Sequence, residues 1–429
     1  MARVSVILTS FNHVNHLRDS IDSVLNQTLS DFELIIIDDA STDGSWEVIS
    51  SYKDPRITAI RCSNHGEVLL DINDAIRNER RAAYIAIQHS DDIWEPTKLE
   101  KQVDLLDRNA EVGAVFSNAL IIAEDGSAFS DTSHFYHGIF NQENRSRHEW
   151  LRFFFRHGNA LCHPSAMIRR SCFLDCGVYD NLYFQLTDLD MWIRICLKYE
   201  IHVLPEKLIR FRVRDNDANA SGNRTEARVR NHYEGFQICE NYRKINTAND
   251  LYKIFPEAEE YHRADKEDLR FVLGYVMVRL AVNPGPRLFA LELLREAIGD
   301  PIRERNIQAT YGFDVMEFGL LTSQYDIFSL EEVSRLHREI AERDRELLKR
   351  DRQIAEQDHR FDERERQLIE RDAQIAEMQE RAAKDAWNLE AITAELAIKD
   401  QGIEKMKASL SWRVTRILRL WGQRGGSGS

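Results

Sequence analysis

The chain has 429 residues, of which 43% are hydrophobic and 30% charged, and only 8 are proline. This composition supplies a hydrophobic core and excludes wholesale disorder, and the length suggests two or three structural units. The formal net charge of -14, from 57 basic and 71 acidic residues, argues against a protein that binds along nucleic acid. No window approaches the roughly 18 consecutive apolar residues of a membrane span.

The N-terminus leads directly into a strand-like segment, without the basic and apolar stretches of a secretory leader. The six cysteines are spread over the chain, which does not indicate a disulfide framework. We therefore expect a reduced, cytoplasmic protein.

Short β-branched runs alternate with amphipathic stretches in the first 120 residues. Runs that are apolar on both faces and separated by helices predict a parallel sheet covered on both sides, hence an α/β domain. The aromatic-rich segment 110–222 is expected to continue this domain, so the first domain is predicted over 1–222. If the domain binds two substrates, this segment is expected to bind the second. The expected strands are Val4–Leu8, Phe32–Ile37, Ile57–Ile60 and Ala83–Ile87.

The sequence pattern changes after residue 222. Residues 223–328 are predicted to be mostly helical, with an interruption at Asn283–Pro286, and their sequence indicates nothing beyond packing. From residue 330 apolar side chains recur every seven positions, which predicts a long helix in a parallel homo-oligomeric coiled coil over 329–408, on the order of 115 Å long. The twelve positions in register are Ile340, Leu347, Ile354, Phe361, Leu368, Ile375, Ala382, Leu389, Leu396, Ile403, Leu410 and Ile417.

The second core position of these heptads is usually polar, as at Asp344 and Asp351, which weakens the seam and does not select dimer over trimer. A solitary charged helix, held by ion pairs four residues apart, is the alternative.

The segment 409–424 has four arginines and no acid, and its apolar side chains, including Trp421, fall on the face opposite three of the arginines. Such a basic, aromatic amphipathic helix predicts binding to an anionic membrane surface, and a terminal cap of the coiled coil is the alternative. Residues 425–429 are expected to be a flexible tail or the remnant of an added sequence.

Acidic pairs follow two of the expected strands, where ligands of open α/β sheets bind. Helix capping does not explain Asp38 and Asp39, whose carboxylates suit hydrogen bonds from a nucleobase or ribose. Asp91 and Asp92 repel each other unless a cation or strong donors compensate, and oxygen ligands suit Mg2+ or Mn2+. Taken alone, such a pair is also typical of a solvated turn.

Three segments in order resemble the signatures of the GT-A, family 2 glycosyltransferases: Ser5–Asn12, Ile37–Ser45 and Ser90–Trp94. The resemblance covers residues 3–222, about half of the chain, and implies a GT-A domain with a Rossmann-like, mostly parallel sheet.

Position by position, the resemblance implies that Thr9 and Asp39, with Asp38 beside them, contact the nucleotide of a nucleotide-sugar donor. Asp91 corresponds to the metal-ligating acid of the DxD-type motif, with Asp92 beside it and Mn2+ or Mg2+ as the cofactor. This chain departs from the family at His89, which replaces the first acid of that motif.

A third acidic cluster, Leu186–Arg194, resembles the family segment that contains the catalytic base before a W-x-R helix, with Thr187 in place of a glutamate. Asp188 falls on the base, which takes the proton of the acceptor hydroxyl as it attacks the anomeric carbon. The alternative for Asp188 is a helix N-cap whose charge favours the helix dipole.

Other positions extend the resemblance. Arg212 and Arg214 match the segment that closes the family's domain and are expected to hold the diphosphate, or else to be ordinary ion-pair partners. His163 lies in a loop similar to the acceptor-side loop, and Trp192 is predicted to contact the acceptor with it. The cysteines near His163 do not have the spacing of a zinc site.

The sequence therefore predicts a metal-dependent, inverting, non-processive glycosyltransferase. It would move a sugar to a glycan acceptor, lipid-linked as in bacterial surface polysaccharide synthesis, while peripheral at the inner face of the cell membrane. The alternatives are a glycosyltransferase that modifies protein, and a non-catalytic coiled-coil scaffold with a degenerate transferase domain. The sugar and the base of the donor are left open.

Overall fold

The computed structural model describes residues 2–78, 82–215, 218–219, 222, 224–368 and 375–422. The chain divides into two compact units, Met1–Tyr325 and Asp326–Ser429, each described by itself. The first unit contains the sheet, with the candidate site at the ends of its strands, together with the first fourteen α-helices of the described chain.

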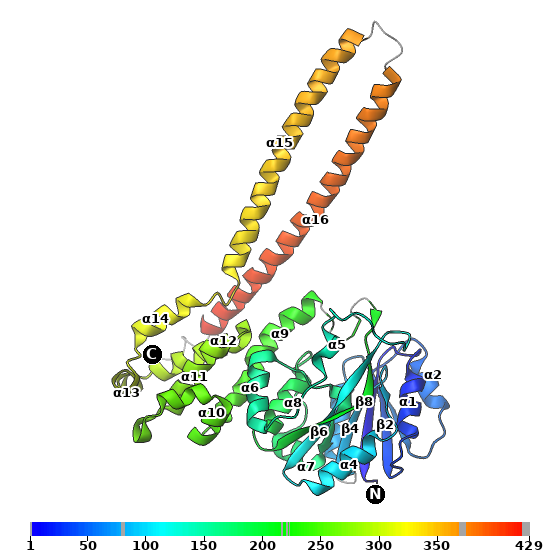
Figure 1. Cartoon of the computed structure of the whole chain (residues 1–429), viewed down its shortest axis with the longest axis vertical. Helices are drawn as coiled ribbons and strands as arrows, with labels where there is room; N and C mark the ends of the chain where they lie inside the picture. Colours follow the sequence, from blue (N-terminus) through cyan, green and yellow to red (C-terminus); the bar gives the residue numbers. More distant parts are fainter. Residues whose placement is uncertain are drawn as a thin grey trace. The chain divides into compact units, whose positions relative to one another are not determined.

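The sheet of the first unit has eight strands in the order β3-β2-β1-β4-β7-β6-β8-β5 (Figure 1). The first four strands in this order pair in parallel, as do β6 and β8, whereas β7 is antiparallel to both of its neighbours and β5 is antiparallel to β8. The predicted α/β class is confirmed. The strands are β1 (Val4–Ser10), β2 (Phe32–Asp38), β3 (Ile57–Arg61), β4 (Tyr84–His89), β5 (Ile93–Trp94), β6 (Val112–Ile122), β7 (Met167–Arg169) and β8 (Glu200–Arg212).

Both faces of the parallel strands β1, β2 and β4 are buried, as their continuous apolar runs predict, whereas the edge strand β3 is partly exposed. On one face Val4, Val6 and Leu8 of β1 join a core with apolar side chains of two helices, among them Ile21 and Val103. The adjacent Ile7 is equally buried and points to the opposite face, because side chains alternate along a strand. The helices that accompany the sheet are α1 (Leu17–Leu25), α2 (Ser45–Ser51), α3 (Val68–Arg77), α4 (Lys98–Arg108), α5 (Tyr136–Ile139), α6 (Arg147–His157), α7 (Arg170–Cys176) and α8 (Thr187–Cys196).

The helical segment after β8 belongs to the same compact unit as the sheet. Its predicted interruption is the start of α12, where Asn283 is the N-cap and proline occupies the first turn. The helices are α9 (Thr225–Ile238), α10 (Ala248–Ile254), α11 (Leu269–Leu280), α12 (Pro284–Ile298), α13 (Pro301–Tyr311) and α14 (Val315–Gln324), with the short 3-10 helices η1 (His163–Ser165), η3 (Cys239–Lys244), η4 (Pro256–Tyr261) and η5 (Ala264–Lys266) elsewhere in the unit.

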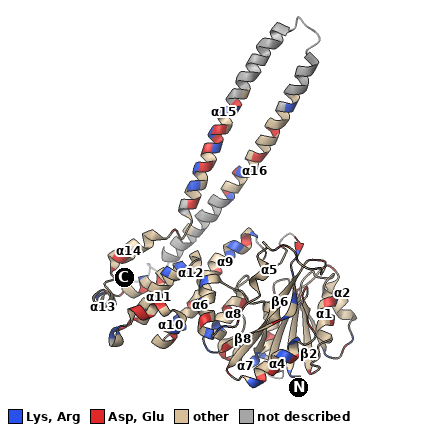
Figure 2. Ribbon diagram, in the orientation of Figure 1, with Lys and Arg blue, Asp and Glu red and all other residues tan. Residues whose placement is uncertain are grey.

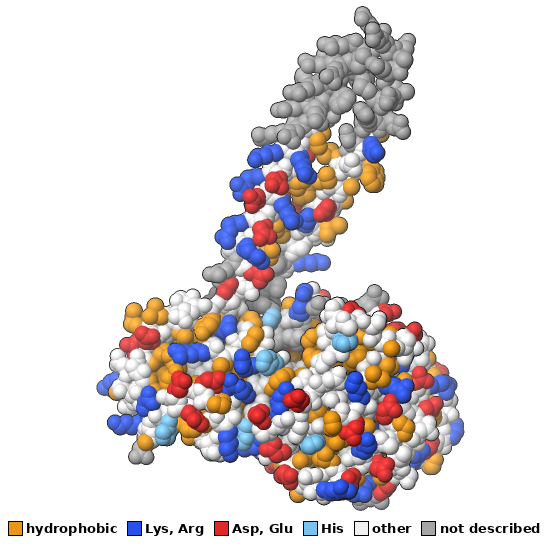
Figure 3. Space-filling view, viewed as in Figure 1, with side chains coloured by type: hydrophobic (Ala, Val, Ile, Leu, Met, Phe, Trp, Pro, Cys, Tyr) orange, Lys and Arg blue, Asp and Glu red, His pale blue; other side chains and the backbone are white. Residues whose placement is uncertain are grey.

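The second unit consists of two long helices, α15 (Leu330–Leu368) and α16 (Ile375–Gly422), and residues 369–374 between them lie outside the described chain. Acidic and basic side chains alternate along the described part of α15, whereas hydrophobic ones gather along α16 (Figures 2 and 3). The pKa of Glu395 is lowered mainly by its hydrogen bond with Lys399 and to a smaller extent by Arg343 of α15.

Of the twelve heptad positions, Ile340, Leu347, Ile354, Leu396 and Ile403 are half-buried and Leu389 is exposed; the side chains of the other six lie outside the described residues. Self-association through this segment stays a prediction. Most side chains of the basic segment 409–424, and all of 425–429, also fall outside the described part. No helix among the described residues is both long enough and apolar enough to span a membrane.

Candidate functional site

The register of the sheet brings the first two motifs and the acidic turn to one edge. Thr9 of β1 pairs with Ile37 on one side and with His89 on the other, and Ser10 pairs with Asp38. These strands are parallel, so their carboxyl ends meet at this edge, as ligand-binding edges of open α/β sheets do. Thr9 is half-buried there.

Asp38 and Asp39 have different surroundings although they are adjacent. Asp38 is fully buried; its Oδ2 accepts a hydrogen bond from the Ser41 amide at 3.1 Å and lies 3.7 Å from Arg61 Nε. Its Oδ1 has no hydrogen-bond partner among the described residues. Asp38 thus stabilises the loop that contains Ser41, and its contact with a nucleotide stays a prediction.

Asp39 is bound by a loop that the sequence did not single out. Its carboxylate accepts hydrogen bonds from the Gly66 amide at 2.9 and 3.0 Å and from His65 Nδ1 at 2.7 Å. The His65 ring, largely exposed, also stacks on Phe11 with 3.8 Å between centroids and 14° between planes. An aromatic face beside a carboxylate acceptor is an arrangement that suits a planar heterocycle with N–H groups.

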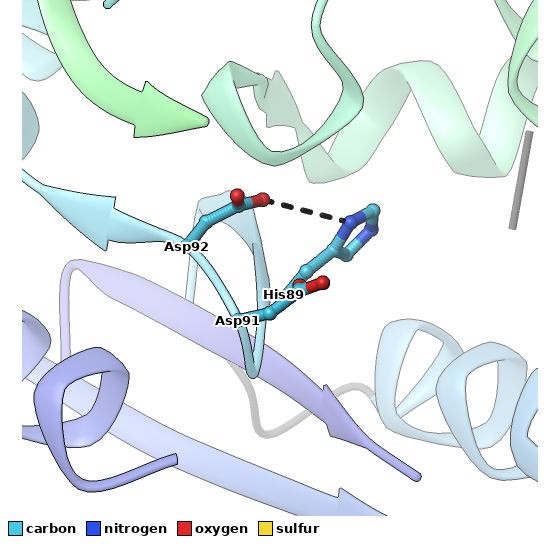
Figure 4. Close-up of side chains that lie close together, drawn as sticks. All are labelled: His89, Asp91 and Asp92. Carbon is cyan, nitrogen blue, oxygen red and sulfur yellow. Dashed lines mark ion pairs between the residues drawn. The ribbon is translucent and has the colours of Figure 1, made fainter. Parts of the chain in front are cut away.

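His89, Asp91 and Asp92 form the one cluster of potential metal ligands found among the described residues, with ligand atoms within 4.8 Å of one another. Figure 4 shows the His89 ring facing the Asp92 carboxylate, and Nδ1 lies 3.9 Å from Oδ2. His89 therefore takes part in the acidic cluster, although it replaces an acid of the motif.

The electrostatics of Asp92 suit a cation. Burial, and next the charge of Asp91, raise the pKa of Asp92 well above its usual range. Its Oδ1 accepts a hydrogen bond from the Arg212 amide at 2.9 Å, whereas the buried Oδ2 has no hydrogen-bond partner within the described part of the chain. Two carboxylates and an imidazole fit Mn2+, and carboxylates alone would equally suit Mg2+. The residues present thus fit a divalent metal ion.

Arg212, the last residue of β8, and Arg214, just after it, make different contacts. Arg212 is buried; its guanidinium donates to the carbonyls of Asp91 at 2.8 Å and Glu124 at 2.7 Å, which holds the acidic turn in place. Arg214 is half-buried beside the cluster: its NH1 contacts His13 Nε2 at 2.6 Å, and His13 Nδ1 lies 3.9 Å from Asp91. Because the guanidinium of Arg212 is already bonded to backbone carbonyls, Arg214 is the better placed of the two for the predicted contact with phosphate.

Asp188 lies in the first turn of α8, where its charge favours the helix dipole, but the N-cap residue is Leu186. The N-cap alternative for Asp188 is therefore wrong. Burial raises its pKa to about 6, against hydrogen bonds from the Leu189 amide at 2.7 Å and Asn159 Nδ2 at 2.6 Å. A carboxyl with a pKa near neutrality is suited to accept a proton at physiological pH.

Cys162 is buried between Asp188 and the acidic cluster in the electrostatic sense only. Burial raises the pKa of its thiol, and the charges of Asp92 and, more weakly, Asp188 raise it further. The geometric link between α8, which carries Asp188, and the acidic cluster is the next residue, His163.

His163 contacts residues of both the acidic cluster and α8. Its ring lies edge-on to His89 at 5.2 Å between centroids, and its Nε2 is 3.0 Å from the Tyr179 hydroxyl. Trp192 is fully buried; it meets the His163 ring at 5.6 Å and offers no exposed surface. Both acceptor assignments stay predictions, and in this structure the Trp192 ring contacts the rings of His163 and Phe116.

The model of the protein family described as glycosyl transferase family 2 matches residues 5–175. The uncharacterized glycosyltransferase MJ1057 of Methanocaldococcus jannaschii is 32% identical over 219 residues, which are 50% of this chain and 72% of that protein. TuaG of Bacillus subtilis, a putative teichuronic acid biosynthesis glycosyltransferase, is 32% identical over 134 residues, 30% of this chain and 52% of TuaG.

WfaP of Escherichia coli is named a UDP-Glc:alpha-D-GlcNAc-diphosphoundecaprenol beta-1,3-glucosyltransferase. It is 33% identical over 107 residues, 25% of this chain and 42% of WfaP. Among solved structures, S. aureus TarS 1–349 in complex with UDP-GlcNAc aligns with a TM-score of 0.47 and 13% identity, over 76% of this chain and 91% of that one. A likeness at that level carries no argument about function.

Proposed function

The chain belongs to glycosyltransferase family 2 and is a glycosyltransferase, and from that premise we propose a metal-dependent, inverting transfer from a nucleotide sugar to a glycan hydroxyl. The observation that supports the proposal most directly is the cluster of His89, Asp91 and Asp92, whose ligand atoms lie within 4.8 Å of one another at the carboxyl ends of the strands. His163 links this cluster to α8, which carries Asp188 with its raised pKa of about 6.

Asp188 is the general base. The acceptor hydroxyl gives its proton to this carboxylate while its oxygen forms the bond to the anomeric carbon and the bond to the nucleoside diphosphate breaks. Asn159 and the Leu189 amide hold the carboxylate in one orientation. One carboxylate suffices, because the nucleoside diphosphate leaves as an anion and does not need the proton that the second carboxyl group of a glycosidase gives to its leaving group.

His89, Asp91 and Asp92 would hold a divalent cation. When bound there, the ion supplies positive charge against the diphosphate that leaves. Arg214 adds a fixed positive charge near Asp91, and Thr9, at the same edge, is assigned to the nucleotide. The Phe11 face and the Asp39 carboxylate form the place for the base, from which His65 has to withdraw.

We assign a lipid-linked glycan as acceptor, in the synthesis of a bacterial surface polysaccharide. Support comes from the printed activities of two relatives, WfaP on a diphosphoundecaprenol-linked sugar and TuaG in teichuronic acid biosynthesis. The basic segment 409–424 would hold the enzyme to the cytoplasmic face of the membrane, and the heptads of 329–408 would join copies of the chain.

The test is a thermal-shift screen of UDP, GDP, dTDP and CMP, each with and without Mn2+, on the wild type and on Asp91→Ala. A nucleotide at 100 times its dissociation constant stabilises the fold by about 2.7 kcal/mol. We expect one nucleotide to stabilise the wild type only with Mn2+, and the variant to lose this metal-dependent part. A shift that is equal in Asp91→Ala would refute the metal assignment.

A further inference from the structure

A single carboxylate from the helical segment holds the loop that precedes Asp188. Glu234 of α9 is almost fully buried, with 2% of its surface exposed. Its two oxygens accept hydrogen bonds from three consecutive backbone amides, those of Phe184 at 2.9 Å, Gln185 at 2.9 Å and Leu186 at 2.7 Å. Three N–H donors around one carboxylate form a nest that compensates for its burial.

The amides bound by Glu234 lie directly before α8. Leu186 is the N-cap residue of this helix, and Asp188 is its second residue. A shift of the loop would therefore move the Asp188 carboxyl with it, because only Thr187 separates the two.

A second contact from the same segment lies on the other side of Asp188. Asn241, in η3, donates a hydrogen bond at 2.8 Å to Oδ1 of Asp190, which is also buried. The other oxygen of Asp190 is held by Arg194 at 2.8 Å. The first turn of α8 is thus bound both before and after Asp188 by residues of the helical segment.

The helix that carries Glu234 is itself fixed by close packing. A Cβ atom on Gly285 of α12 would lie 2.5 Å from the His232 carbonyl oxygen and 2.8 Å from the Phe236 amide. These two backbone atoms flank Glu234 on α9. The backbones of α9 and α12 thus approach as closely as glycine permits, which leaves Glu234 little room to move.

We propose that Glu234 is a positioning residue of the active site, which fixes the loop 184–186 and through it the catalytic Asp188. The proposal rests on the proposed function, because that function gives Asp188 its role. It makes the helical segment 223–328 a part of the active site, a role that the sequence of this segment does not indicate.

Because Glu234 is charged, its replacement should also change the pH dependence of activity, an effect that unfolding of the variant would not produce. The pKa of Asp188 is raised mainly by burial, and Glu234 adds a smaller increase. The variant Glu234→Gln keeps the size of the side chain, but removes the charge and replaces one acceptor oxygen with a donor. Its activity should therefore begin at a lower pH than that of the wild type.

We expect Glu234→Gln to lower kcat by about 10- to 100-fold, because a base displaced by about 1 Å loses that much rate. The KM for the donor should stay unchanged, and the acidic limb of the kcat profile should move to lower pH. Glu226→Gln is the matched control: Glu226 is exposed on the first turn of the same helix, and its replacement should leave rate and profile as in the wild type. A wild-type kcat and profile in Glu234→Gln would overturn the proposal.

Hydrogen exchange on the wild-type protein tests the contact without any variant. The amides of residues 184–186 should exchange as slowly as those of α9, and fast exchange at these three amides would overturn the proposal even if Glu234→Gln fails to fold. The proposed function would fail in a different way. The wild-type protein would then neither transfer sugar nor bind a nucleotide, and this result does not depend on Glu234.

Discussion

The position of Asp188 suits its proposed role as a base but lowers the stability of the fold when the carboxyl group is ionised. Its pKa is raised from 3.8 to about 6 by burial, so the folded protein binds a proton there more tightly than the unfolded chain does. The stability that this group contributes is fully present below a pH of about 4 and is lost as the pH rises through about 6. At neutral pH the carboxylate is ionised, as the proposed role of a base requires, and the fold loses stability because this charge is buried.

Asp188→Asn should therefore be more stable than the wild type above pH 7, by up to about 3 kcal/mol for a shift of roughly two units. The difference should shrink as the pH falls through 6 and should disappear below the unfolded-state pKa of 3.8, where the wild-type carboxyl is protonated in both states. Melting temperatures of the two proteins between pH 3 and pH 8 check this. A variant less stable than the wild type at pH 8 would show that the ionised carboxylate gains more from its hydrogen bonds than burial costs it.

His65 occupies the two groups that we assign to the nucleobase, the Phe11 face and the Asp39 carboxylate. The nucleotide has to displace one hydrogen bond and one ring contact, which costs about 1 kcal/mol. His65→Ala should therefore bind the nucleotide about 3- to 10-fold more tightly, as measured by calorimetric titration.

Ser63→Ala, at an exposed position of the same loop, serves as the control and should bind as the wild type does. Weaker binding by His65→Ala would mean that the histidine holds the base rather than blocks its place.

At the scale of elements, the loops after β1 and β2 are joined to each other. Asn12 has a φ of 53° and Ala40 a φ of 58°, both in the left-handed region. Asn12 donates from its amide to Ser41 Oγ at 3.0 Å and accepts from the Thr42 amide at 2.9 Å through its side chain. Asparagine tolerates this conformation better than other residues with a Cβ, so it can serve as the joint between the two loops.

Asn12→Ala should lower the free energy of unfolding by about 1–2 kcal/mol, because it loses a hydrogen bond and keeps the left-handed φ. Asn12→Gly loses the same hydrogen bond but relieves the backbone, so it should cost less. Urea denaturation of the three proteins gives both values, and equal losses for alanine and glycine would argue against backbone strain at this position.

The sequence predicts the first four strands, β1 to β4, because each is a mostly apolar run followed by a polar cluster; the expected Phe32–Ile37 and the observed β2 differ by one residue. It does not delimit β6 and β8, the other parallel pair, which lie in the segment of mixed pattern. It does not reveal β7, which has only three residues and exists through pairing with β4 and β6. The acidic cluster with His89 could be located from the motifs. Glu234 could not, because its partners lie about fifty residues earlier and are backbone amides, which leave no trace in the sequence.

For the whole molecule, the division after Tyr325 separates a compact unit with the complete candidate site from the two long helices. A chain that ends at Tyr325 should keep nucleotide binding, be monomeric and bind liposomes weakly, whereas the full chain should be oligomeric and bind anionic liposomes. Light scattering and liposome sedimentation check this. A truncated protein that is still oligomeric would place assembly elsewhere, and a monomeric full chain would mean that α15 and α16 pair only with each other.

In the proposed mechanism, one site binds the donor with a metal ion and uses Asp188 as the base. The most direct measurement compares donor binding and sugar transfer in the wild type and in Asp188→Asn, with Mn2+ present and the anomeric configuration of the product determined by NMR. We predict an inverted product, unchanged donor affinity in the variant, and a turnover lowered by at least about 100-fold. Near-normal turnover of Asp188→Asn, or a product with retained configuration, would contradict the account.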